Sequence, residues 1–422
     1  MNSPVSIEQP HRNLFVRNLL TFFLNRQALA IGLVFASDSI LFGSWVAHIP
    51  YVKAKLHLSD SELGLLLFAM PAGLLVMNPL TGWIVAKLGE ARTCFWSAVG
   101  ITVSICIPLN APNPAVLAIG LFLLGLNAAL INVAMNTCAT NLERARGIVI
   151  MSSCHGMWSL GGLLGSGIAG AVIMLHVSPP VHVMVMAGLV LLMTFALQPM
   201  LATIPSTNQG DVGEKADRTA SGEMPVRRSG LPDRRPESSF VRPNRDLLLM
   251  ILIGLALAMG EGAAFDWSAV YLRETLGASS QVAALGFASF SLTMTGFRFL
   301  GDAIIPKIGA KRWLQIGGVL SASGLLFAIA LPYPPTALLG FALLGVGCSL
   351  GAPILYAAAL RVPGIPPAAG LATFATFSFI GFLAGPPIIG FIAEGFGLYY
   401  GLGFVAVMLL ISTGLSRIVN LF

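Results

Sequence analysis

Three carboxylates stand inside long apolar stretches of this 422-residue chain. Glu261 and Asp266 share one stretch, and Asp38 is alone in another. Ionised groups at the depth of a membrane are costly, so they usually mark the path of a solute or an ion. A carboxyl at that depth can take up a proton from one side and release it to the other. These acids therefore predict proton coupling across a membrane.

The depths of the three acids suggest separate roles. Asp38 lies about 11 residues into its stretch, roughly 16 Å deep, and Glu261 about 14 residues, roughly 21 Å. Asp266 is five residues beyond Glu261, about 140° around a helix, so the two should not share one proton closely. We expect Glu261 to couple protons or to bind hydroxyl groups. Asp266, near the outer end, could instead cap or gate, and Asp38 could be a neutral carboxyl bonded within its own helix.

Histidine and asparagine side chains occur in two further apolar stretches. His155 could relay protons because histidine titrates near neutrality, or it could be a buried histidine with its hydrogen bonds satisfied. Asn132 and Asn136 are four residues apart and share a helical face, and Asn127 lies earlier in the same stretch. Amides on one face suit a hydroxylated ligand, although they also bond helices together. We predict a role in substrate binding or gating for these three asparagines.

Arg298 is a cation inside the eighth apolar stretch. A buried charge needs a partner, because an unpaired one is costly to desolvate. A structural ion pair with Asp302 or Glu261 is the favoured interpretation. An anionic substrate is the alternative partner.

Five aromatic side chains could stack on the apolar faces of a sugar, namely Trp45, Trp158, Trp267, Tyr271 and Tyr356. Trp and Tyr are also common where a membrane meets water. That second interpretation suits Trp45 and Trp267, which lie near the outer ends of their stretches. Trp158 is deeper and close to His155, so it is the better candidate for stacking.

The composition is that of an integral membrane protein. Hydrophobic residues make up 56% of the chain and charged residues 10%, whereas a soluble domain carries about 25% charged residues. The net charge of +6 does not indicate nucleic-acid binding, because the basic residues cluster at the ends of apolar runs and in one linker. We find no metal-ligand cluster, haem motif, phosphate-binding loop or nucleophile–base pair, so we expect no cofactor, no metal and no enzymatic activity.

The chain divides into twelve apolar runs, each long enough to cross a membrane as a helix. Their approximate ranges are 28–52, 61–86, 93–110, 114–140, 148–176, 181–203, 247–273, 281–305, 312–332, 335–361, 367–394 and 398–419. A polar, charged stretch at 204–245 separates the sixth run from the seventh and is typical of a flexible linker. We therefore predict an all-α membrane protein with a segment at 1–27 and two six-helix bundles at 28–203 and 246–419.

The distribution of basic residues predicts the orientation. If both termini are cytoplasmic, 20 of the 24 lysines and arginines fall on the cytoplasmic side. Lys53, Lys55 and Arg273 would lie on the outer side. Because cytoplasmic loops carry an excess of Lys and Arg, we expect cytoplasmic termini in a bacterial inner membrane. Lipids, a small-molecule substrate and protons are the expected partners.

The two halves repeat at an offset of 220 residues. This offset relates Gly89 to Gly309, Ser59 to Ser279 and Gly125 to Gly345. Chance similarity between apolar runs would not keep one offset across loops. Duplicated halves of a transporter place the binding site between them near the middle of the membrane, and one half rocks against the other during transport.

Twelve runs, a basic central linker and a six-plus-six repeat resemble the major facilitator superfamily. The segment from Gly82 to Gly89 (GWIVAKLG) is similar to the cytoplasmic GxxxDRxG signature of that superfamily, with Ala86 in place of the Asp and Lys87 in place of the Arg. A closer resemblance, over nearly all runs, is to the YbjJ-like bacterial branch, which is related to fucose-permease-type sugar:proton symporters and to MosC proteins. The matching segments include SWVAHIP at 44–50, NVAMN at 132–136, HGMWSLG at 155–161 and GFRFLG at 296–301.

This resemblance implies two pseudo-symmetric bundles, a monomer, and a central cavity lined by Glu261. His48 stands where the branch has Arg, Asn132 where an acid is common, and Asp38 is an addition. We predict a proton-coupled transporter of a small polar solute such as a sugar, a polyol or a related metabolite. The alternatives are an exporter of amphipathic drugs or metabolites, and a solute sensor that signals through the linker without transport.

Overall fold

The computed structural model describes residues 20–205 and 242–419. The predicted segment at 1–27 and the predicted linker at 204–245 lie largely outside these described residues. Twelve helices in the described part are long and apolar enough to cross a membrane. Side chains exposed along the outside of the bundle are largely apolar, among them Trp83, Trp96 and Leu192, as expected for a surface that faces lipid. The predicted all-α membrane fold is confirmed.

The helices of the two halves follow in chain order. In the first half they are α2 (Arg26–Ala47), α3 (Ile49–Lys55), α4 (Asp60–Leu67), α5 (Ala69–Leu88), α6 (Glu90–Ser104), α7 (Cys106–Asn110), α8 (Pro114–Arg146), α9 (Met151–Met174) and α10 (Pro179–Leu201). In the second they are α12 (Arg245–Gly262), η1 (Ala263–Trp267), α13 (Ser268–Val270), η2 (Tyr271–Thr275), α14 (Ser280–Ile308), α15 (Ala310–Ala330), α16 (Pro334–Cys348), α17 (Gly351–Ala359), α18 (Pro367–Phe396) and α19 (Leu398–Ile418).

Several of these spans are interrupted where the apolar pattern predicts a continuous run. The first run ends as a helix at Ala47, and α3 starts separately with Pro50 in its first turn, where a proline is tolerated because its missing N–H is not needed. The seventh run changes from α-helix to π-helix at Ala263. The tenth run breaks between α16 and α17. Hydropathy does not register such breaks, because the residues on both sides are apolar.

The 220-residue repeat is visible in the helix ends and in the packing. Gly89 and Gly309 both end a helix at positive φ, 83° and 87°, a conformation that favours glycine. A Cβ atom at Gly125 would overlap the carbonyl oxygen of Met70, and one at Gly345 would overlap that of Phe290. The same close helix approach therefore occurs once in each half, at the same offset.

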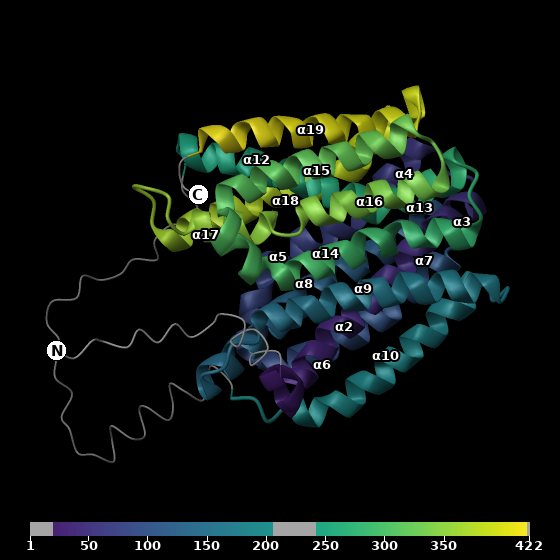
Figure 1. Ribbon diagram of the computed structural model, residues 1–422. Helices are drawn as coiled ribbons and strands as arrows, with labels where there is room; N and C mark the ends of the chain where they lie inside the picture. The colour runs from purple at the N-terminus through teal and green to yellow at the C-terminus, as the bar shows by residue number, and fades with distance from the viewer. Residues whose placement is uncertain (1–19, 206–241, 420–422) are drawn as a thin grey trace, which may run out of the picture.

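We name the two ends of the bundle by their loops. The linker side is the end at which residues 202–244 connect the halves, and the far side is the end that carries α3 and the loops 56–59 and 276–279. Figure 1 shows the first half in purple to teal and the second half in green to yellow, with α9 and α14 lying side by side between them. The candidate functional site lies between the halves.

Candidate functional site

A cavity of about 330 Å³ lies between the two halves. Its walls come from both halves: Asp38, Leu41, Phe42, Trp45, Leu67, Met70, Pro71, Leu74, Ile101, Ile105, Leu121, Leu124, Ala128, Asn132 and Trp158 from the first, and Phe265, Asp266, Phe379 and Phe382 from the second. Among the described residues that line it, the ionisable ones are Asp38 and Asp266. The cavity thus brings together five residues singled out in the sequence: Asp38, Trp45, Asn132, Trp158 and Asp266.

Asp38 is held against Trp158 by a very close approach of α2 and α9. The indole Nε1 of Trp158 donates a hydrogen bond to Oδ2 of Asp38 over 3.1 Å. Gly161 and Gly165, four residues apart on α9, face α2, where a Cβ atom at Gly165 would overlap the carbonyl oxygen of Ile40. Small residues at this spacing allow membrane helices to pack backbone to backbone. The close packing places the acid and the indole at the same height on the cavity wall.

Asp266 reaches the cavity from the π-helical segment η1. π-Helical turns are rare and often occur at functional sites, because they change the direction in which side chains point. Phe265, its neighbour, lies at the centre of an aromatic cluster. Its ring is stacked on Phe382 at 6.0 Å between centroids and is edge-on to Phe42 at 5.4 Å and to Trp158 at 6.4 Å. Aromatic rings from both halves therefore line the same cavity as the two acids.

A smaller cavity of about 100 Å³ adjoins the first and contains Glu261 and Tyr356. It shares Phe379 and Phe382 with the central cavity, so these two rings stand between them. Arg298 lies beside Glu261, with Nη2 4.0 Å from Oε2. Of the two partners predicted for this cation, Glu261 is thus the one whose placement is described, because the side chain of Asp302 lies outside the described part.

Arg298 also connects the two halves. Its Nη1 donates to the hydroxyl of Ser159 on α9 over 3.3 Å, and its Nε donates to the carbonyl of Ser349 over 3.4 Å. The partly buried guanidinium therefore contacts α9, α12 and the break between α16 and α17. This arrangement couples the helix that carries Trp158 to the helix that carries Glu261.

Other predicted site residues lie outside both cavities. Trp267 is fully buried in the core, and its indole N–H has no hydrogen-bond partner among the described residues. Asn127 packs against Gly100 and donates to the carbonyl of Leu123 over 2.8 Å. These two side chains stabilise helix packing and do not line the central cavity.

Asn136 and His155 are near the cavities without lining them. Asn136 donates to the carbonyl of Asn132 over 2.8 Å, so its amide is bonded back into its own helix. His155 is exposed on α9, with its ring edge-on to Phe35 at 5.3 Å between centroids. Of the asparagines on the fourth span, Asn132 is therefore the one that the structure places on the cavity wall.

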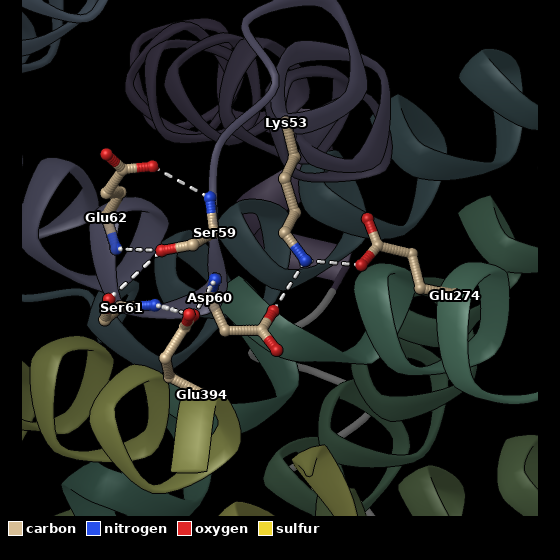
Figure 2. A network of polar contacts seen from close by, with 7 residues as sticks. All are labelled: Lys53, Ser59, Asp60, Ser61, Glu62, Glu274 and Glu394. Atoms are coloured by element: carbon tan, nitrogen blue, oxygen red, sulfur yellow. Dashed lines mark hydrogen bonds and ion pairs between the residues drawn. The ribbon is translucent and has the colours of Figure 1, made fainter.

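On the far side, a polar network joins the two halves (Figure 2). Lys53 on α3 forms ion pairs with Asp60 at 2.5 Å and with Glu274 of the second half. Glu394 on α18 accepts hydrogen bonds from the backbone N–H groups of Asp60 and Ser61, over 3.0 and 3.4 Å. A carboxylate at a helix N-terminus interacts favourably with the unpaired N–H groups and with the helix dipole. Glu394 therefore caps α4 from the opposite half.

Lys53 keeps its charge in this network. Burial alone would lower the pKa of Lys53, but its hydrogen bonds and ion pairs with Asp60 and Glu274 outweigh that effect and raise the pKa above its usual value. The ammonium group therefore stays protonated in the physiological range. It holds one acid from each half at the same point.

From this network toward the linker side, the two halves stay in contact along α9 and α14 but separate between α5 and α18. A Cβ atom at Gly64 on α4 would overlap the carbonyl oxygen of Pro386 on α18. By contrast, α18 barely contacts α5, which continues α4 toward the linker side. The α9–α14 seam is packed from Gly156 against Phe299 to Gly170 near Gln281. The halves thus meet across the far side and diverge between α5 and α18.

A pair of histidines connects the end of α2 to α10. His48 Nε2 and His182 Nδ1 are 2.8 Å apart and buried. Burial, together with repulsion from His182, lowers the pKa of His48 to about 3. His48 is therefore neutral near pH 7 and shares one hydrogen bond with His182.

Sequence reasoning missed the aromatic wall and the far-side network. Phe42, Phe265, Phe379 and Phe382 were not distinguished from the many other phenylalanines in apolar runs. Lys53 carried a signal, since it is one of few cations expected on the outer side and its repeat counterpart is Arg273. That counterpart bonds to the carbonyl of Ala278 in its own loop, so the repeat alone did not indicate a contact between halves. Within the described residues, no group of three His, Cys, Asp or Glu is placed to hold a metal ion.

The chain is similar over most of its length to known membrane proteins. A family model described as Major Facilitator Superfamily matches residues 28–304. An uncharacterized MFS-type transporter of Yersinia pestis is 31% identical over 394 residues, which cover 93% of this chain and 96% of that protein. The membrane protein MosC of Rhizobium meliloti is 29% identical over 376 residues, which cover 89% of this chain and 86% of MosC.

The fold is also shared with solved transporter structures. A bacterial homologue of the human lysosomal transporter Spinster, in an inward-facing and occupied conformation, superposes with a TM-score of 0.70 at 14% identity. The match covers 98% of this chain and 97% of that one. The family match, the relatives and the twelve-helix architecture together show that this chain belongs to the major facilitator superfamily of membrane transporters.

Proposed function

We propose that the protein is a secondary transporter that moves a small polar solute through the central cavity by alternating access, coupled to protons. The observation that carries this proposal is the cavity between the halves, in which Asp38 and Asp266 face one space from opposite bundles. Solute sites of transporters with repeated halves lie at this interface. Acids at membrane depth are suited to binding and releasing protons.

The contacts between halves support an alternating mechanism. The α4–α18 contact and the network of Lys53, Glu274 and Glu394 hold the far side together, whereas α5 and α18 separate toward the linker side. In the orientation proposed here, with cytoplasmic termini in a bacterial inner membrane, the cavity is reached from the cytoplasm. Rocking one half against the other would break the far-side contacts and expose the cavity to the outside.

The solute class has two candidates. A sugar, polyol or related metabolite is supported by the aromatic rings and by the amide of Asn132. Export of an amphipathic molecule is favoured by the wall itself, in which Asp38, Asp266 and Asn132 stand among aliphatic and aromatic side chains. Asn127 and Asn136 donate their side-chain amides to backbone carbonyls of their own helix. Of the three asparagines that favoured a hydroxylated solute, Asn132 is therefore the one left to bind it.

Solute-driven proton movement tests the proposal. The purified protein is reconstituted into vesicles that contain a pH-sensitive dye, and sugars, polyols, amino acids and amphipathic quaternary ammonium ions are added outside in turn, with protein-free vesicles as the background. We expect at least one solute to change the internal pH. Asp38→Asn keeps the size and removes the ionisable group, and it should reduce the solute-driven proton flux by about tenfold or more.

Asp246→Asn is the matched control. Asp246 lies in the first turn of α12 on the linker side, about 30 Å from Asp266 along the helix, and the substitution removes the same charge. It should leave the flux unchanged. Coupling at these acids would be refuted if Asp38→Asn and Glu261→Gln both moved solute together with protons at the normal rate.

A further inference from the structure

The balance of hydrogen-bond donors and acceptors in the central cavity points to a solute that carries a positively charged ammonium group on an apolar body. This inference rests on the proposed transport function and specifies its substrate class. It follows from which polar groups line the cavity, which of them already have partners, and what covers the remaining wall.

The polar groups of the cavity are predominantly acceptors. A carboxylate accepts hydrogen bonds and donates none, and two of the three strongly polar side chains on the wall, Asp38 and Asp266, are carboxylates. The indole N–H of Trp158, a potential donor, is already bonded to Asp38. Within the described part of the chain this leaves the amide of Asn132 and the indole N–H of Trp45 as the remaining side-chain donors on the wall.

The two acids also lack a basic partner. Glu261 has Arg298 within 4.0 Å, whereas no ion pair is found for Asp38 or Asp266 among the described residues. Each lies partly buried on the cavity wall. An isolated carboxylate in an apolar setting must be neutralised by a proton or by a cation. A cation that enters the cavity meets two such acids, one from each half.

A neutral sugar fits this set of groups less well. Each sugar hydroxyl brings acceptor lone pairs as well as a donor, and a ring with several hydroxyls would bury more acceptors than Asn132 and the indole of Trp45 could serve. Buried polar groups without partners weaken binding considerably. An ammonium group brings three donors and no acceptor, which complements carboxylates directly.

The rest of the wall suits a cation with an apolar body. The faces of aromatic rings attract cations electrostatically, and Phe42, Trp45, Phe265, Phe379 and Phe382 contribute rings from both halves. On the other side, aliphatic side chains of α5, α6 and α8 offer an apolar surface. The solute would place its charged end against the acidic side chains of the wall and its apolar end against these helices.

Matched pairs of small molecules test this inference on the unmodified protein. Cyclohexylammonium, benzylammonium and phenethylammonium are each compared with the alcohol of nearly the same shape, namely cyclohexanol, benzyl alcohol and phenethyl alcohol. Binding is measured by calorimetry and by the melting temperature of the purified full chain, since a ligand of the folded state raises that temperature. We expect at least one ammonium ion to bind about tenfold or more tightly than its alcohol.

The variants locate the binding site. Asp266→Asn and Asp38→Asn should each abolish the preference for the ammonium member, whereas Asp246→Asn should preserve it. Equal binding of both members of every pair, stronger binding of the alcohols, or no binding by any of the ammonium ions would overturn the inference. A preference that survives in both cavity variants would overturn it as well.

Vesicle flux separates this inference from the function on which it rests. Selective ammonium binding without ammonium transport would leave the inference standing and contradict the transport proposal. Transport of a neutral sugar or polyol, with no ammonium binding, would support transport and overturn the ammonium class.

Discussion

Among single residues, His48 is a buried titratable group whose contacts define its charge state. It is buried beside His182 and shares a hydrogen bond with it, and its pKa is lowered to about 3 by burial and by the neighbouring imidazole. In the unfolded chain a histidine has a pKa near 6.5. Between about pH 6.5 and pH 3 the histidine is therefore protonated in the unfolded state and neutral in the folded state. The folded state loses stability as the pH falls through this range.

His48→Gln should flatten this pH dependence. The wild-type protein should lose about 2 kcal/mol from this residue between pH 7 and pH 5, a loss that the variant should not show, although it should be somewhat less stable at pH 7. Melting curves of the purified proteins across this range measure the difference. The control is His57→Asn at an exposed histidine on the same side, where φ is 54° and Asn tolerates that conformation. Parallel curves for wild type and His48→Gln would contradict the prediction.

Much of the cavity could be predicted from residue type and depth. Asp38, Asp266, Trp158 and Asn132 were singled out because polar or amphipathic side chains in apolar runs are costly unless they serve a purpose. Trp267 could not be placed by the same reasoning. It was judged by its position near the outer end of its stretch, which does not say whether a side chain faces the cavity or the core, and the structure buries it in the core at the end of a π-helical segment.

At the scale of helices, the α2–α9 seam should depend on its glycines. Gly165→Val would force the helices apart, because a Cβ atom there overlaps the carbonyl oxygen of Ile40. The variant should lose on the order of 2 kcal/mol or more, with weaker solute-driven proton flux because Asp38 and Trp158 separate. Gly167→Val is the matched control, since this glycine of the same helix faces open space. Equal melting temperatures for the two variants would show that the seam tolerates the added bulk.

The twelve spans could be predicted because a membrane crossing requires about 20 apolar residues, and runs of that length can be read directly from the sequence. The interruptions could not. Where α2 gives way to α3 and where α16 gives way to α17, residues on both sides are apolar, so the hydropathy is unbroken. The repeat was detectable because helix-ending glycines and close-packing glycines recur at one offset, as Gly89 and Gly309 illustrate.

For the molecule as a whole, Lys53 should bias the equilibrium between conformations. Lys53→Gln removes the charge that holds Asp60 and Glu274 together, so the state that is open on the far side should become more populated. If the ion pairs contribute about 1 kcal/mol, that population should rise about fivefold. Leu67→Cys, on the far-side half of the cavity wall, reports the change through labelling by a membrane-impermeant maleimide added from the far side.

Lys55→Gln is the control for this measurement. Lys55 is on the same short helix, and its ammonium donates to the carbonyl of Leu109 within the first half over 3.1 Å. Losing it removes the same charge without breaking a contact between halves. Faster labelling in both variants would indicate a general effect of charge, and unchanged labelling in Lys53→Gln would show that the network does not hold the far side closed.

The contact of Glu394 with α4 has an implication for how this protein can vary among its relatives. Glu394 binds the backbone N–H groups of residues 60 and 61, and every amino acid except proline supplies such a group. Position 61 can therefore be substituted by any residue except proline without weakening its hydrogen bond to Glu394. Correlated substitution should link Asp60 with Lys53, whose side chains meet, and should be absent between 394 and 61. The part of this contact that runs through backbone N–H groups would thus be invisible to comparisons of paired positions in related sequences, and any correlated substitution of Glu394 should involve Ser59, whose side chain it also contacts.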